Sequence, residues 1–150
     1  MEQSEAFDAL LERLAYLSDG EFDNLPEWQR SLTLVHQFAL DAMGDGVGSL
    51  FYNHPERVDG VVQALLTLGE LELAEGLRAT ARILEPFVAD GPPNWQEILV
   101  EQCLEGVAAQ RIEELGKLLD ERWGALYAKL EELARSNGWG RSLGGGDTPS

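Results

Sequence analysis

The sequence predicts an all-α protein, folded as a single-domain bundle of about six helices. Three observations support this prediction. Apolar residues recur with helical spacing along most of the 150 residues, and no segment combines β-type alternation with hairpin turns. A hydrophobic content of 44%, with four tryptophans among the aromatic residues, is enough for one core. A chain of this length is typical of one domain, which we expect over residues 1–135.

The first expected helix spans residues 4–17, because one of its faces is apolar: Phe7, Leu10, Leu11, Leu14 and Leu17. We expect a loop after it, through Asp19, Gly20 and Asp23. A second helix then runs from Pro26 to about Met43. Asn24 stands before it as a cap residue, followed by an early proline and by Glu27 at capping-box spacing.

Three glycines within residues 44–48 interrupt this helical pattern, so we expect a structured break near residues 44–50. Of the aromatic pair that follows, we expect Phe51 inside and Tyr52 partly exposed. The cap, proline and glutamate pattern then recurs at Asn53, Pro55 and Glu56. It begins a third helix over residues 58–68, with Gly69 at its C′ position.

Three further helices are expected over residues 70–88, 95–109 and 110–135. The fifth contains Gly106, where we expect a break, and the last has the longest and clearest apolar stripe. We therefore expect the last helix to pack across the others. Residues 136–150 contain five glycines and a proline, which predicts a flexible, disordered tail.

Charge is the property in which the chain departs most from an average protein. It has 27 acidic and 11 basic residues, a net charge of −16 and a sequence pI near 4.3. Residues 1–75 contribute 15 acids and three bases, and residues 76–150 contribute 12 acids and eight bases. Such a chain repels nucleic acid and anionic membranes, so we expect neither as a partner.

Catalytic, metal and cofactor sites are not expected. Cys103 is the single cysteine, which excludes an intrachain disulfide and favours a reducing compartment, so we expect a cytoplasmic protein. We expect Cys103 itself to be a small buried residue. His36 and His54 lack the partner spacing of a metal or nucleophile site. The segment from Asp41 to Gly46 resembles part of a calcium loop, but Met43 occupies a ligand position, and so does Tyr52 at loop position 12.

The glycine-rich break resembles the core of a family of small bacterial helical domains that includes a DNA-mimic protein. That core reads roughly Asn-Gly-Gly-Phe-x-Gln-Phe-Phe-x-Asn. In this chain Gly46, Phe51 and Asn53 match it within Gly44 to Asn53, and the likeness continues through Ala64 to Gly69. The resemblance covers about residues 32–135. It implies a helical protein whose acidic surface occupies the DNA-binding face of a protein partner.

We therefore expect a basic protein partner, either a DNA-binding protein or a toxin. The DNA-mimic hypothesis has two alternatives, an immunity-type protein that neutralises a basic toxin or nuclease, and an enzyme with an unrecognised site. The chain is expected to be a monomer or a homodimer, the latter through the apolar face of residues 110–135. The acids hypothesised to form one contiguous partner-binding strip are Glu12, Asp19, Glu21, Asp23, Glu27, Asp41, Asp45, Glu56 and Asp59.

Overall fold

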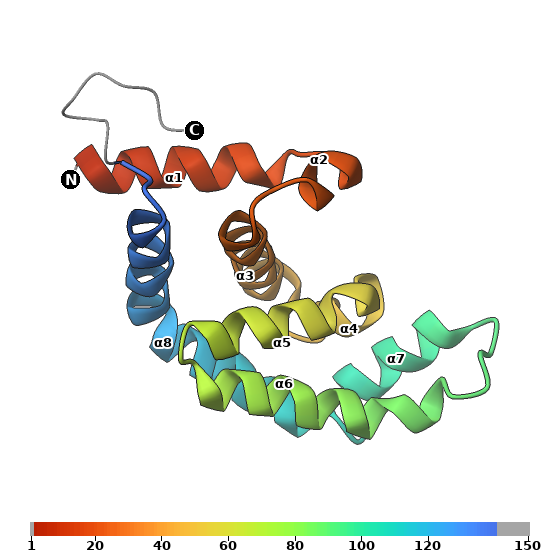
Figure 1. Ribbon diagram of the computed structural model, residues 1–150. Helices are drawn as coiled ribbons and strands as arrows, with labels where there is room; N and C mark the ends of the chain where they lie inside the picture. Colours follow the sequence, from red (N-terminus) through yellow and green to blue (C-terminus); the bar gives the residue numbers. More distant parts are fainter. Residues whose placement is uncertain (1, 141–150) are drawn as a thin grey trace.

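The structure is a computed structural model that describes residues 2–140, apart from the side chains of residues 2–4 and Asp19. This described part consists of α-helices and short 3₁₀ helices and contains no strand, which confirms the all-α prediction (Figure 1). The elements are α1 (Glu2–Ala15), α2 (Asp19–Asp23), α3 (Glu27–Asp45), α4 (Ser49–Asn53), η1 (Pro55–Arg57), α5 (Val58–Thr67), α6 (Leu71–Leu84), η2 (Glu85–Phe87), α7 (Trp95–Leu104) and α8 (Ala109–Ser136).

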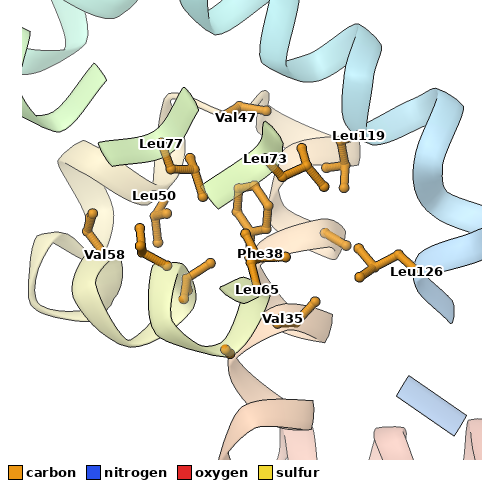
Figure 2. Close-up of a cluster of buried hydrophobic side chains, with 14 of the residues drawn as sticks. Val35, Phe38, Val47, Leu50, Val58, Leu65, Leu73, Leu77, Leu119 and Leu126 are labelled. Atoms are coloured by element: carbon orange, nitrogen blue, oxygen red, sulfur yellow. The ribbon is translucent and has the colours of Figure 1, made fainter. Parts of the chain in front are cut away.

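The core lies where α3, α5, α6 and α8 meet. Gly69, with a φ of 77°, ends the turn that joins α5 to α6, and these helices lie side by side as an antiparallel pair (Figure 1). Helix α3 packs against α5, and its Phe38 stands among apolar side chains of the neighbouring helices (Figure 2). The labelled side chains around it include Val35, Leu65, Leu73, Leu77 and Leu126, all fully buried.

Helix α8 runs from α7 to α1 and contacts both. Its 28 residues extend about 40 Å and pack against α3, α6 and α7, so the predicted packing across the bundle is confirmed. Near its end, Tyr127 meets the buried Phe7 of α1 edge to face at 5.3 Å. Trp139 contacts Phe7 in the same way at 5.4 Å, so packing continues into the first residues of the predicted tail. Residues 141–150 of that tail lie outside the described residues.

A buried carboxylate fastens α8 to the turn between α5 and α6. Glu70 is only 4% exposed, and it precedes α6. Arg122 donates to both of its oxygens, at 2.9 Å through Nε and 2.7 Å through Nη2, and Lys129 donates through Nζ at 2.6 Å. Two of the scarce basic residues are therefore committed to an internal structural contact.

Two short helices occupy segments for which the sequence pattern predicts loop or break. Ser18 and Glu21 form a reciprocal capping box that begins α2. Helix α4 lies within the predicted glycine-rich break. A helix of five residues contains too few apolar positions to show a period, which is why both were missed.

The two predicted asparagine caps are wrong. Asn24 ends α2, and its side-chain amide donates to the carbonyl of Gly20, whereas α3 starts after Pro26 without a side-chain cap. Asn53 is the last residue of α4, and its side chain accepts from Gln96 of α7. The cap, proline and glutamate pattern locates both helix starts, but the side chain of Asn24 bonds to α2 and that of Asn53 bonds to α7.

The expected interruption of the fifth helix is confirmed: α7 ends at Leu104 and α8 begins at Ala109. A Cβ on Gly106 would lie 2.7 Å from Cα of Gln102, so only glycine allows this close approach. The side chain of Gln102 then accepts from the amide of Val107 at 3.2 Å. None of the helices within residues 2–140 combines the length and hydropathy needed to cross a bilayer.

Candidate functional site

The predicted partner-binding acids form two groups at opposite ends of α3. The first group consists of Glu12 on α1, Asp19, Glu21 and Asp23 on α2, and Glu27 at the start of α3. The second group consists of Asp41 and Asp45 in the last turns of α3, Glu56 on η1 and Asp59 on α5. Their described side chains are exposed or half-buried, and the side chain of Asp19 lies outside the described part. From Glu27 to Asp45 the helix rises about 27 Å. Because residues 28–40 contain Arg30 and no acid, α3 does not join the two groups into one strip.

The second group is drawn together by His54. Its Nε2 lies 3.9 Å from Oδ2 of Asp41, and its Nδ1 lies 3.8 Å from Oε1 of Glu56. These separations exceed hydrogen-bond length, so the contacts are ionic only when the imidazole is protonated. Asp45 lies one helical turn after Asp41 on α3, and its charge is, after burial, a cause of the raised pKa of Tyr52. We refer to Asp41, Asp45 and Glu56 as the acidic corner.

The glycine-rich motif fixes the acidic corner against α7. Gly46 has a φ of 88°, and its carbonyl accepts from Oγ of Ser49 at 2.8 Å. A Cβ on Gly48 would lie 3.0 Å from Cβ of Cys103, so the chain passes very close to α7 there. The glycines of the motif therefore serve packing, and the accessible charges of this region belong to Asp41, Asp45 and Glu56.

The end of α4 is also bonded directly to α7. Nε2 of Gln96 donates to the carbonyl of Tyr52 at 2.8 Å and to Oδ1 of Asn53 at 3.3 Å. Phe51 is buried and Tyr52 is half-buried, as predicted. Contacts made by the motif residues therefore hold the acidic corner and α7 in a fixed relation.

The solvent-facing side of α7 carries an acidic row that the sequence prediction missed. Glu97, Glu101 and Glu105 recur every four residues and are exposed. They line a shallow groove of about 460 Å³ together with Val100 and Leu104, and the groove reaches Gln96 beside α4. Leu104 is 64% exposed although it is a large apolar residue. The four-residue spacing was visible in the sequence, but which face of α7 points outward was not.

The acidic corner and the α7 acidic row belong to the two longest segments of the chain without a lysine or arginine. Residues 31–56 contain three acids and no such base, and residues 83–110 contain five acids and no such base. The fold brings these segments together through the contacts of α4 with α3 and α7. These two segments therefore contribute carboxylates to this region and no lysine or arginine.

The other residues singled out by the sequence have structural surroundings. Burial raises the pKa of the Cys103 thiol to about 11, which opposes formation of a thiolate. Burial also lowers the pKa of His36, against the opposing charge of Asp8. Within the described part of the chain, no three or more histidine, cysteine, aspartate or glutamate side chains gather closely enough to hold a metal ion.

Comparison with known families gives one match. The model of a family described as DMP19-like protein matches residues 23–138, which include α3 to α8 and exclude α1. Both the acidic corner and the α7 acidic row lie inside this region, whereas Glu12, Asp19 and Glu21 lie outside it. No curated protein and no solved structure matches the chain.

Proposed function

This chain belongs to the DMP19-like protein family, and from that membership we propose that it is an acidic protein-binding module, not an enzyme, which acts as a DNA mimic. In this role it occupies the DNA-binding surface of a transcription factor or nucleoid protein. The observation that carries the proposal is the packing of the two base-free segments against each other. Their eight acids, unaccompanied by lysine or arginine, account for half of the net charge of −16.

The amount of charge agrees with this role. Duplex DNA carries one negative charge per ~1.7 Å of its axis, so a net charge of −16 corresponds to about 27 Å of duplex. The α7 acidic row alone has one carboxylate per ~6 Å of helix, about half the density of one DNA strand. A mimic must therefore present the row and the acidic corner together.

The groove of α7 supports a protein partner in particular. Val100 and Leu104 add exposed apolar surface between the carboxylates, and such surface finds a complement on a protein side chain. Charged groups around an apolar centre favour fast, selective association with an oppositely charged surface. This arrangement fits a partner whose arginines and lysines flank an apolar side chain.

The test is affinity capture from a lysate of the source organism, at low and high salt, with duplex DNA as competitor. We expect a DNA-binding protein to be retained at low salt, released by high salt and displaced by duplex. A triple variant of the α7 acidic row, Glu97→Gln, Glu101→Gln and Glu105→Gln, should lose this capture.

A matched control variant removes the same number of charges from exposed positions of α8: Asp120→Asn, Glu121→Gln and Glu132→Gln. We expect the control to retain the partner. Capture of a nuclease or other toxin that duplex DNA fails to displace would replace mimicry with the immunity-type function. If both variants lost capture of the partner equally, capture would depend on net charge alone and not on the α7 acidic row.

A further inference from the structure

A second concave site lies outside the acidic corner and the α7 acidic row. It is an open cavity of about 490 Å³ lined by residues of α4, η1, α5, α6, η2 and α7 and by Val88. Its volume lies within the range of about 300–1,000 Å³ typical of small-molecule sites. The cavity is therefore large enough for an organic ligand.

The inner wall of this cavity is apolar. Phe51, Val58, Leu84 and Leu99 line it, and each is at most 8% exposed. Their surfaces favour an apolar body over water, because a cavity with apolar walls offers water few hydrogen-bond partners. The wall therefore favours a ligand that has an apolar body.

The rim of the cavity is charged and contains two arginines one helical turn apart. Arg78 and Arg82 both lie on α6 and line the opening. Nη1 of Arg78 donates to Oε1 of Glu75 at 3.1 Å. Arg82 makes no hydrogen bond or ion pair with any residue that the structure describes, although its guanidinium offers five donors.

The rim differs in charge balance from the rest of the surface. Asp59 and Glu85 also line the cavity, so the charges of the lining residues sum to zero in a chain of net charge −16, while Glu75, the partner of Arg78, lies outside the lining. Among the described ion pairs, none joins either carboxylate to Arg78 or Arg82. An anion can therefore approach here, while the two carboxylates oppose a second negative charge on the same ligand.

We propose that this cavity binds a small amphipathic monoanion. Its carboxylate lies between Arg78 and Arg82, and its apolar body lies against Phe51, Val58, Leu84 and Leu99. Arginine suits this role because its planar guanidinium binds carboxylates with paired hydrogen bonds.

Octanoate is a suitable probe, and NMR titration of the full chain measures its binding. We expect saturable shifts of backbone amides around the cavity, and at least tenfold weaker binding of the neutral octan-1-ol. Arg82→Gln should weaken octanoate binding at least tenfold and leave the fold intact, because Arg82 is exposed and makes no hydrogen bond or ion pair with a described residue.

Arg111→Gln is the matched control, since Arg111 is an exposed arginine of α8 that does not line the cavity. It should leave octanoate binding unchanged. Ala81→Leu places a larger side chain in the cavity and should abolish binding of both probes while thermal unfolding remains cooperative. The proposal fails if octanoate gives no saturable shifts, if octan-1-ol binds equally well, or if Arg82→Gln and Arg111→Gln behave alike.

Discussion

Glu70 shows how a single residue can set the acid limit of the fold. The hydrogen bond from Arg122 is the largest cause of its lowered pKa, with a further contribution from Lys129. A carboxylate whose pKa is lower in the folded chain stabilises the fold above its unfolded pKa, which for glutamate is about 4.3. That stabilisation is lost as the pH falls from this value through the pKa of the folded state.

Replacing Glu70 by glutamine should lower the free energy of unfolding at pH 7 by about 2–3 kcal/mol, because bonds from two cations to a buried carboxylate are weakened. The loss should shrink as the pH falls below the unfolded pKa of about 4.3 and through the lower pKa of the folded state, since the wild-type carboxylate is then increasingly protonated. Urea unfolding across this pH range measures both effects. Glu131→Gln, which removes an i,i+4 pair with Arg135, is the control and should cost less than about 1 kcal/mol. An equal loss in both variants would contradict the assigned role of Glu70.

At the scale of elements, two glycines around the end of α3 should respond in opposite ways to alanine. Gly44 lies within α3, and a Cβ there would meet nothing within 4 Å, so Gly44→Ala should stabilise the chain by up to about 1 kcal/mol. Gly48→Ala should destabilise it by about 1–3 kcal/mol, because its Cβ would press on the buried Cys103.

Thermal and chemical unfolding of the two glycine variants provide the measurement. The substitution is the same and the positions are four residues apart, so composition and unfolded-state effects nearly cancel. If Gly48→Ala were neutral or stabilising, the close contact between the motif and α7 would not contribute to stability. The motif would then need another explanation.

Long helices were predictable from the sequence because their apolar residues repeat many times. The last helix was predicted over residues 110–135 and is found at Ala109–Ser136. The short helices α2 and α4 were not predictable in this way, because they contain too few apolar positions to repeat. The caps predicted at Asn24 and Asn53 failed for another reason: each residue has the correct chemistry for a cap, but its side chain bonds to another helix. Local pattern locates a break in the chain, but it does not tell which group the side chain of an asparagine at that break will bond to.

The candidate site was predicted only in part for a related reason. Asp41, Asp45 and Glu56 were predicted as part of one acidic strip, and the fold places Asp41 and Glu56 within 4 Å of His54, with Asp45 one helical turn after Asp41. The proximity of this corner to α7 depends on contacts between residues more than 40 positions apart, such as that of Gln96 with Asn53. Periodicity contains no information on such contacts, so neither the α7 acidic row nor the cavity lined by Arg82 was foreseen.

At the scale of the whole molecule, the distribution of bases matters more than the net charge. Several bases are held in pairs with acids, as in the contacts of Arg122 and Lys129 with Glu70 and of Arg135 with Glu131. The base-free segments 31–56 and 83–110 have no such internal neutralisation from their own residues. The field of the protein should therefore be strongly negative in the solvent around the acidic corner and α7.

This asymmetry predicts that charge position, not charge number, governs association with the DNA-binding partner that we propose. The α7 triple variant and the α8 control variant each raise the net charge by three. The α7 variant should slow association by about tenfold and flatten its dependence on ionic strength, because steering depends on carboxylates that face the encounter. The α8 variant should change the rate by less than about twofold, and stopped-flow mixing over a range of salt concentrations measures both.

Dissociation rates separate steering from direct contact in the same experiment. A carboxylate that only steers changes the association rate, whereas one buried in the complex also changes dissociation. Leu104→Ala provides the apolar counterpart, since it leaves the charge intact and removes a side chain that is 64% exposed. It should speed dissociation and leave the salt dependence of association unchanged. If the α7 and α8 variants slowed association equally, net charge alone would drive encounter, and the paired base-free segments would have no special role in it.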